Sequence, residues 1–335
     1  MMLNTKRSKA QGYIASLVVV LLSVVATVFL LLNRQQIIDQ VYVWQYQPST
    51  EISAFSSRTS MSDRGEFLFY ASHPSIEESQ VFNEKCAKIE RSAAILGCYN
   101  GRNIYIYNVK NPKLDGIREV TSAHEMLHAA YLRLSEKDRQ KVDVLVEAEY
   151  AKLSDDKEFS ERMAFYARTE PGERDNELHS IIGTEVAAVS SELENYYKQY
   201  FNDRSKVVAL HSQYASVFAS LQLRSDELSA QLTVLADAIE ENSDVYNVRV
   251  NQLNRDIAAF NARASGGEFE TQEQFDAERA TLTAQVASLD ELRASINADR
   301  AAYNDLREEL LSIASESDAL NRSIDSSSLA PTPSL

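Results

Sequence analysis

Two runs of apolar residues at three- and four-residue spacing fill 204–325, and this pattern restricts over a third of the chain to one architecture. Ser265-Gly266-Gly267 separates the runs, and Thr271 with Gln274 forms a capping box that starts the second helix. Two apolar seams joined by a short glycine loop predict an antiparallel coiled-coil hairpin about 90 Å long at 1.5 Å per residue. The expected seam residues are Leu228, Leu232, Leu235, Ile239, Asn242, Tyr246, Val250, Leu253, Ile257, Phe260, Leu282, Val286, Leu289, Ile296, Tyr303, Leu306, Leu310, Ile313, Leu320 and Ile324.

Heptads alone do not distinguish a hairpin within one chain from pairing between chains. The short glycine loop favours the hairpin, but self-association or a separate protein partner stays open. Residues 326–335 follow the second run and are expected to form a disordered tail.

The N-terminal region has the pattern of a membrane span. Residues 12–33 are almost wholly apolar and carry no charge, and as a helix they are long enough for about 30 Å of hydrocarbon. Three basic residues precede this run and only Arg34 closely follows it, so the positive-inside rule leaves 1–11 in the cytoplasm and the rest of the chain outside. We expect a single-pass anchor in a bacterial plasma membrane. A cleaved signal peptide is the alternative, disfavoured because the run is long and lacks a small-x-small cleavage site.

Charge and cysteine content narrow the function further. The net charge of -15, with no basic cluster, argues against a nucleic-acid partner. The only two cysteines, Cys86 and Cys98, lie in the portion expected outside the cell, where thiols oxidise readily. The sequence predicts a disulfide between them. Two buried free thiols are the alternative, and zinc binding by the pair is disfavoured because the spacing is not Cys-x-x-Cys.

The pentapeptide His124-Glu125-Met126-Leu127-His128 carries the chemistry. A helix places residues i and i+4 on one face, so both histidines can hold one tetrahedral Zn²⁺ while Glu125 reaches a water molecule beside it. Apolar residues recur at helical spacing around the motif, without internal proline or glycine. The sequence therefore predicts one zinc ion per chain with Glu125 as general base. Two helix histidines that merely pack or cap are the alternative.

The segments around this motif predict a small mixed domain. Residues 34–64 are expected to be a linker, since Pro48 to Ser62 is rich in Ser and Thr. Residues 65–203 are expected to form the zinc domain, with a strand at 66–71 and a β-hairpin made by 94–99, an Asn-Gly turn and 104–107. Helices are expected at 137–153, at 159–167 and from about 176. The fold class is α+β, mostly α.

A third zinc ligand must come from the chain after His128. The metzincin pattern His-x-x-Gly-x-x-His is absent, which leaves a carboxylate on a later helix, and Asn176 to Glu185 is the best source. Residues 104–190 thus resemble gluzincin metallopeptidases, the thermolysin-like and lethal-factor-like group. The resemblance implies Glu177 as ligand, because Glu177 follows Asn176 as in the Asn-Glu pair of that group, with Glu185 as the alternative. Ile181 stands where many gluzincins place an acid that orients a zinc histidine.

The same resemblance implies further roles. Ile104–Tyr107 would be an edge strand that pairs with an extended peptide substrate, although an ordinary core strand is an equal alternative. Tyr166, in a Tyr-x-Arg-Thr stretch like that before the lethal-factor ligand, would donate to the developing oxyanion. His179 would also stabilise the oxyanion, or would be a structural histidine.

The sequence as a whole predicts a membrane-anchored, extracytoplasmic zinc metalloendopeptidase acting on a peptide or protein substrate. One alternative is a noncatalytic cell-envelope scaffold, in which the coiled coil is functional and the zinc domain is degenerate or structural. A third is hydrolysis of another amide, such as a cell-wall peptide cross-link.

Overall fold

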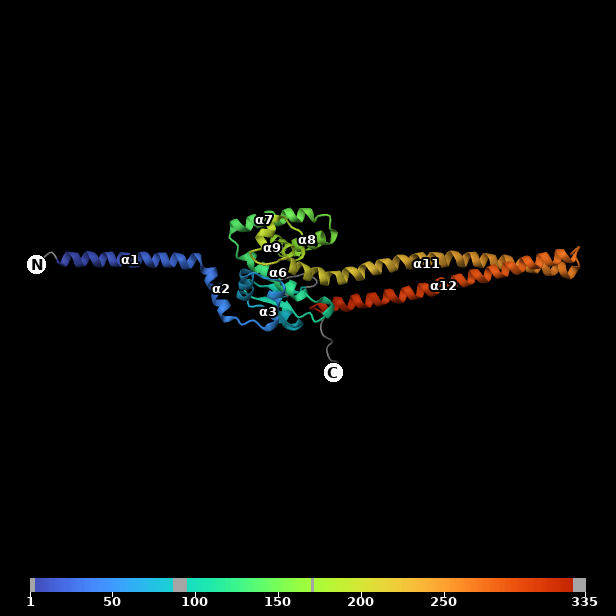
Figure 1. The fold of residues 1–335 in the computed structure, drawn as a ribbon, viewed down its shortest axis with the longest axis horizontal. Coiled ribbons are helices and arrows are strands. Elements are labelled where there is room, and N and C mark those ends of the chain that lie inside the picture. Colours follow the sequence, from blue (N-terminus) through green and yellow to red (C-terminus); the bar gives the residue numbers. More distant parts are fainter. Residues whose placement is uncertain (1–3, 87–94, 170–171, 328–335) are drawn as a thin grey trace, which may run out of the picture. The chain divides into compact units, whose positions relative to one another are not determined.

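The computed structural model describes residues 4–86, 95–169 and 172–327. The chain divides into two compact units, Met1–Ser216 with Asn321–Leu335, and Val217–Leu320. Helices dominate both units, and a three-stranded sheet belongs to the first (Figure 1). The structure is therefore mostly helical with a small sheet, as the sequence indicates.

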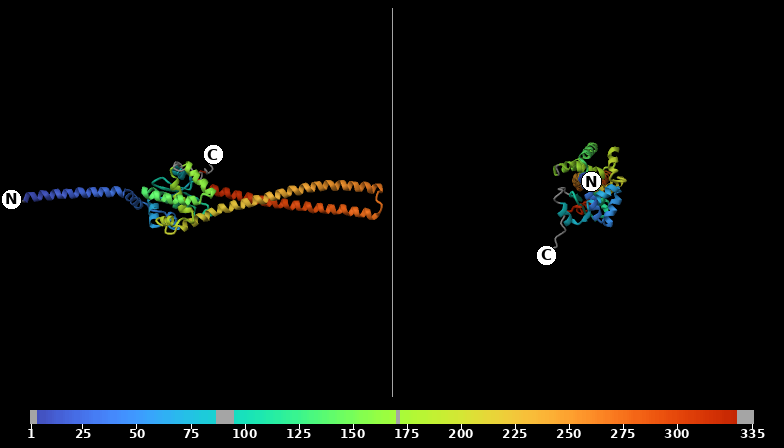
Figure 2. Two further views of the ribbon diagram at one scale, coloured as in Figure 1. Left: turned by 90° about the horizontal axis from the view of Figure 1, so that it is seen from above. Right: turned by 90° about the vertical axis from the view of Figure 1, so that its left-hand side faces the viewer.

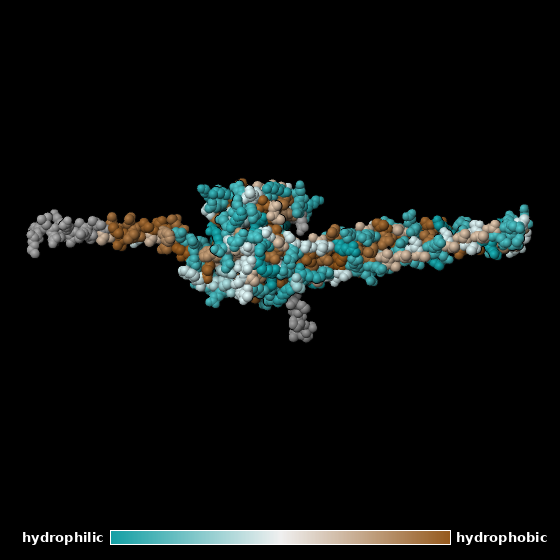
Figure 3. Space-filling view, viewed as in Figure 1, coloured by the Kyte–Doolittle hydropathy of each residue, from teal (hydrophilic) through white to brown (hydrophobic). Residues whose placement is uncertain are grey.

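The N-terminal helix α1 (Asn4–Leu32) is long and apolar enough to cross a membrane. Its segment Ala15–Leu32 has a mean hydropathy of 2.9, and none of it is buried inside the protein. The exposed apolar side chains of this segment are visible in Figure 3. Among the described residues it is the one helix with these properties.

The expected linker at 34–64 is wrong. Helices α2 (Arg34–Gln45) and α3 (Thr50–Arg58) occupy it, and α4 (Asp63–Ala71) begins within it. Ile52 and Phe55 of α3 are buried in the core. The serines that resemble linker composition are helix caps: Ser49 accepts a hydrogen bond from the Ile52 N–H, and Ser62 caps α4 in the same way.

The expected strand at 66–71 is also wrong, because this segment belongs to α4. Leu68 and Phe69, adjacent residues of this helix, are both buried in the core. A Cβ at Gly65 would lie 2.3 Å from the Tyr200 carbonyl oxygen, so the glycine permits a close approach of α4 to another segment.

The sheet consists of β1 (Ser75–Glu77), β2 (Gly97–Tyr99) and β3 (Ile104–Tyr107) in the order β1-β3-β2. Strands β2 and β3 form the expected antiparallel hairpin, with Tyr99 opposite Ile104 and the turn glycine Gly101 at φ 84°. Residue 94, the expected start of the hairpin, lies outside the described residues. The expected edge position of Ile104–Tyr107 is wrong: β1 pairs with its other side, so β3 is central and β2 is an outer strand.

The predicted disulfide between Cys86 and Cys98 is present. It joins the end of α5 (Ser79–Cys86) to β2, and both cysteines are fully buried beside Phe82. After the sheet, a short 3₁₀ helix η1 (Pro112–Leu114) leads into α6.

Helix α6 (Ile117–Leu132) contains the histidine motif and runs through the core of the first unit. It packs against α9 (Arg174–Glu185). The glycine at 183 makes this close approach possible, since a Cβ there would lie 2.5 Å from Leu127 Cδ1. Around them lie α7 (Glu136–Lys152), α8 (Lys157–Thr169) and α10 (Ser191–Tyr197). The helices expected at 137–153, at 159–167 and from about 176 are thus present, displaced by a few residues at their ends.

The second unit, Val217–Leu320, contains most of α11 (Ser205–Gly266) and of α12 (Gln272–Ile324). The two arms run along each other (Figures 1 and 2). Arg263 pairs with Glu278 near the loop, and Arg224 pairs with Glu309 far from it, which fixes an antiparallel register. The loop end also contains the expected cap, since the Gln274 N–H donates to Thr271. The buried seam residues include Leu228, Leu253, Phe260, Leu289, Ile296 and Leu320.

Two expectations about the C-terminal third are wrong. Val286 is 42% exposed and does not belong to the seam. Ser326 is buried and exchanges two hydrogen bonds with Asn83 of α5, so the chain stays ordered beyond the start of the expected tail. The rest of that tail, from 328 on, lies outside the described residues.

Candidate metal centre

Helices α6 and α9 bring His124, His128 and Glu177 together. The Nε2 atoms of the two histidines are 2.9 Å apart. The Glu177 carboxylate lies 3.4 Å from His128 Nε2 and 3.6 Å from His124 Nε2. Potential ligand atoms of all three residues lie within 4.8 Å of one another. Of the two carboxylates that the sequence offers as third ligand, the structure places Glu177 at the histidines.

These distances fit a tetrahedral zinc ion. Zinc bound at 2.0–2.2 Å by nitrogen and oxygen ligands separates neighbouring ligand atoms by about 3.3 Å, close to the three separations observed here. His128 and Glu177 are buried, and His124 is partly exposed. The Glu177 Oε2 atom is buried without a hydrogen-bond partner, which is the state expected of a carboxylate oxygen reserved for a metal.

Asn176 orients His128. Its Oδ1 lies 2.9 Å from His128 Nδ1, and its Nδ2 donates to Glu173 Oε2 at 3.0 Å. The Ser180 hydroxyl is a second neighbour of the same ring nitrogen, at 3.3 Å. Because Asn176 Oδ1 accepts a hydrogen bond from the His128 Nδ1–H, the lone pair of the imidazole is on Nε2, on the side of Glu177. Asn176 thus supplies the contact to a zinc-motif histidine that an apolar Ile181 cannot make. The only sequence signal for this role of Asn176 is its position directly before Glu177.

The protonation states also suit a metal. Burial lowers the pKa of His128 and outweighs the opposite pull of Glu177, so the imidazole is neutral. Burial raises the pKa of the Glu177 carboxyl, but a hydrogen bond from His124 and nearby positive charge, including Arg162, outweigh it and leave that pKa below its usual value. A neutral imidazole and an ionised carboxylate are the forms that bind a metal.

Glu125 lies on α6 beside the ligands but is not one of them. Its side chain is buried and faces β2: a Cβ at Gly97 would lie 2.7 Å from Glu125 Oε1 and 2.5 Å from the Thr121 methyl. Only glycine fits here without displacing the carboxylate. Gly97 is therefore part of the site, and the sequence signal for it is a glycine inside a predicted strand.

Glu185, the alternative ligand, is used elsewhere. Its Oε2 accepts a hydrogen bond from Arg162 at 2.8 Å and lies 3.4 Å from His211 Nε2. The structure therefore does not bring Glu185 to the two motif histidines.

His179 is enclosed in an aromatic cluster. It is 0% exposed, its Nε2 lies 2.9 Å from the Tyr196 hydroxyl, and its carbonyl accepts a hydrogen bond from Tyr197. Burial lowers the pKa of His179 to about 3, so the ring is neutral. This environment favours the structural interpretation over a role at the oxyanion. Tyr166 lies on α8, which supplies none of the three ligands, so its oxyanion role stays a prediction.

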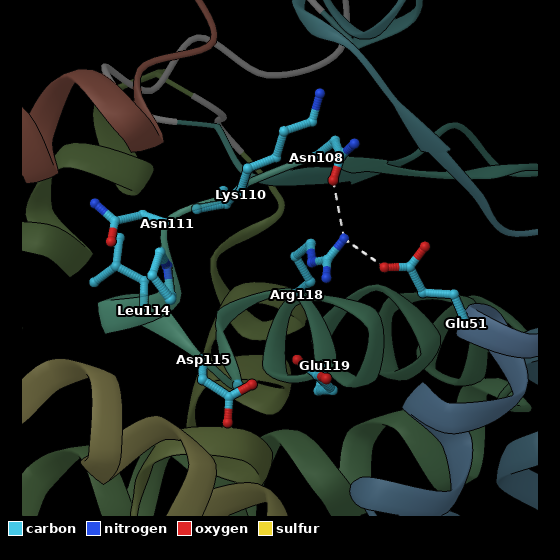
Figure 4. Close-up of a pocket in the computed structure, with 11 residues that line it drawn as sticks. Glu51, Asn108, Lys110, Asn111, Leu114, Asp115, Arg118 and Glu119 are labelled. Carbon is cyan, nitrogen blue, oxygen red and sulfur yellow. Dashed lines mark hydrogen bonds and ion pairs between the residues drawn. The ribbon is translucent and has the colours of Figure 1, made fainter.

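A polar pocket of about 370 Å³ surrounds the first turn of α6 and includes none of the ligand residues (Figure 4). Within it Arg118 donates to Asn108 at 2.9 Å and to Glu51 at 2.7 Å. Arg58 donates hydrogen bonds to two of the lining residues, Asp115 and Glu119. These ion pairs fix the beginning of α6, and thereby the helix that carries the histidines.

Comparison with known proteins found no match: no family model, no curated protein and no solved structure matches this chain. A functional assignment therefore depends on the geometry of His124, His128 and Glu177.

Proposed function

We propose that this protein is a zinc-dependent metallopeptidase, anchored by α1 in a bacterial plasma membrane with its metal domain outside the cytoplasm. The observation that carries the proposal is the convergence of His124, His128 and Glu177 from two helices, with Glu125 beside them. A purely structural zinc site has no need of an adjacent carboxylate that does not bind the metal.

Each residue of the site has a defined task. Zn²⁺ held by the three ligands would polarise a scissile carbonyl and lower the pKa of a water molecule. Glu125 accepts the proton of the attacking water and returns it to the leaving amine. Asn176 keeps the His128 ring in the orientation and tautomer that the site requires.

The sheet contributes to the site through β2. This strand is outer in the sheet order, and a Cβ at its Gly97 would lie 2.7 Å from Glu125 Oε1. All three residues of β2 are buried, so its edge is not open to an added peptide strand. The substrate-pairing role expected of Ile104–Tyr107 is therefore not transferred to β2.

Metal content tests the proposal directly. Full-length protein purified in detergent is analysed by mass spectrometry for zinc, as wild type, His128→Ala, Glu177→Ala and Glu185→Ala. We expect one zinc per chain, lost in His128→Ala and Glu177→Ala but kept in Glu185→Ala, which is the matched control. A folded wild-type protein without affinity for zinc would refute the metal centre. A screen of soluble peptides then tests for cleavage.

The second candidate function is a noncatalytic envelope scaffold. The observation that favours it is that Val217–Leu320 forms a compact unit of its own with no residue of the metal centre. In this case the Glu125→Gln variant would retain the cellular function of the protein, whereas loss of the hairpin would abolish it.

A further inference from the structure

Helix α2, which directly follows the apolar helix, is held to the metal helix by a buried ion pair. Arg133 Nε and Nη2 donate to the two carboxylate oxygens of Asp39, each at 2.8 Å. Both side chains are nearly inaccessible to solvent, at 11% and 4% exposure. Arg133 Nη1 also donates to the Tyr99 hydroxyl of β2. One arginine therefore joins α2, α6 and the strand next to Glu125.

Aromatic contacts hold the rest of α2. The His73 ring donates to the Tyr42 carbonyl at 2.9 Å and stacks on Tyr46 with ring centroids 5.1 Å apart. The Tyr46 hydroxyl donates to the Pro74 carbonyl at 2.6 Å. The Arg102 guanidinium lies over the Tyr42 ring at 5.0 Å. Helix α2 is thus an integral part of the metal domain and not a tether to it.

The connection to the apolar helix is equally short. Only Asn33 lies between α1 and α2, and backbone hydrogen bonds continue through it: Asn33 N–H to Phe29 O and Ile37 N–H to Asn33 O, both 3.0 Å. Asp39 lies about 10 Å beyond Leu32 along a helix at 1.5 Å per residue, and at most about 25 Å beyond it for any chain conformation. Arg133 follows His128 by about 7 Å along α6.

From these contacts we propose that the metal centre is held at a short, fixed height above the bilayer, and that its substrates are the membrane-proximal segments of polypeptides anchored in the same membrane. This inference rests on the proposed peptidase function and on α1 as an uncleaved span. A chain cut next to its own anchor presents the scissile bond at that height, whereas a bond displayed far from the bilayer is out of reach.

The test uses full-length protein in liposomes with two single-span substrates. Both carry a peptide sequence that the enzyme cleaves in solution, either directly after the span or after a rigid helical spacer of about 60 Å, which takes about 40 residues. We expect the near substrate to be cut at least about tenfold faster, because the far site has almost no effective concentration at the metal centre.

Two insertions of the same flexible Gly/Ser segment separate height from general disturbance. An insertion of about 120 residues between Asn33 and Arg34, with a root-mean-square reach of about 60 Å that matches the spacer, should remove the preference for the near substrate. The same insertion between Gly266 and Gly267, in the hairpin loop, should leave the preference intact. Both variants should cleave the soluble peptide like wild type. Equal cleavage of near and far substrates by wild type overturns the height limit but leaves the peptidase proposal standing.

A distance measurement decides the height without turnover. A fluorophore on Lys137→Cys, at an exposed position in α7, transfers energy to acceptor lipids in the liposome. Both native cysteines are in the disulfide, so the label is specific. We expect efficient transfer that falls when the segment is inserted after Asn33. Transfer that the insertion leaves unchanged, or a membrane-derived protein whose intact mass lacks α1, overturns the proposal. If no soluble peptide is cleaved, the peptidase function and the substrate inference both fail, while this measurement still reports the height.

Discussion

Glu125 is the residue on which the peptidase proposal depends most directly. It follows His124 on α6 and is not one of the three potential ligands, so Glu125→Gln should remove the general base and leave the metal bound. We expect turnover to fall by about 10²- to 10⁴-fold with unchanged zinc content, measured by peptide cleavage and by mass spectrometry of the metal. Glu136→Gln, an exposed position on α7, is the control. Full activity in Glu125→Gln would refute the assignment.

Asn176 holds the His128 ring in the orientation and tautomer that can bind a metal. Asn176→Ala removes the acceptor for the Nδ1 proton and frees the ring to rotate, so zinc affinity should fall about 10- to 100-fold. Competition with a chelating dye measures the affinity. Asn176→Asp, which keeps the acceptor, should retain more affinity than Asn176→Ala. Asn195→Ala, at an exposed position on α10, should change nothing. Equal affinity in wild type and Asn176→Ala would show that the orienting contact is dispensable.

Between elements, the Glu149 carboxylate of α7 accepts a hydrogen bond from the backbone N–H of Ser190, the N-cap residue of α10. Burial raises the pKa of Glu149, but hydrogen bonds from Lys152 and from Ser190 outweigh it and leave the pKa below its usual value. The stabilisation is therefore complete above about pH 4.5, the pKa in the unfolded chain, and is lost as the pH falls through the folded-state pKa. Glu149→Gln should reduce the free energy of unfolding by about 1 kcal/mol at neutral pH.

Denaturant unfolding of wild type and Glu149→Gln between pH 3 and 7 checks this, with Glu136→Gln as the exposed control. The difference between wild type and Glu149→Gln should shrink as the pH falls below about 4.5. A difference that is constant over the whole range would show that the charge of Glu149 does not contribute.

The contact between β2 and α6 gives a second prediction at this scale. Gly97→Ala places a methyl group against Thr121 and Glu125, so it should cost about 1–3 kcal/mol of stability and displace the general base. We expect lower thermal stability and slower peptide cleavage with zinc still bound. Gly101→Asn, in the turn of the same hairpin, has no neighbour within 4 Å and a residue type that tolerates positive φ, so it should have little effect. Normal cleavage by Gly97→Ala would show that β2 does not position Glu125.

The elements that sequence reasoning predicted well are those with a local cause. The spacing of His124 and His128 alone puts them on one helix face. Gly101 tolerates the positive φ that its turn requires, and the Thr271 side chain caps the start of α12. The missed elements depend on distant partners. The run Phe67–Tyr70 is apolar throughout, so its periodicity does not separate a helix from a strand, and α4 is decided by packing against Tyr200.

The residues of the site also divide into those predicted from local sequence and those that depend on distant contacts. Two ligands and the general base lie within five residues, so the motif identifies them. The choice between Glu177 and Glu185 depends on which turn of α9 meets α6, and both lie on nearly the same helix face. Tertiary contacts decide it: Glu185 is occupied by Arg162 and His211, and Glu177 faces the histidines. Gly97 approaches Glu125 only in the folded sheet.

For the whole molecule, the metal centre and the hairpin have separate physical supports. The ligands lie on helices of the first unit, whereas Val217–Leu320 is stabilised by its own seam and by pairs such as Arg263–Glu278. A chain of this kind can combine catalysis in one unit with partner binding in the other. Removal of one unit therefore distinguishes the two candidate functions.

Replacing Val217–Leu320 by a short flexible Gly/Ser segment should leave zinc content and the cleavage of soluble peptides close to wild type, because no ligand, orienting residue or general base is removed. Metal analysis and peptide cleavage by the detergent-solubilised protein measure this. The full-length Glu125→Gln variant is the complementary experiment, with the hairpin intact and the chemistry removed. For a peptidase, only Glu125→Gln loses peptide cleavage; for a scaffold, only the excision affects cellular function. A folded excision variant that no longer binds zinc would contradict the independence of the two units and make the hairpin part of the metal centre's support.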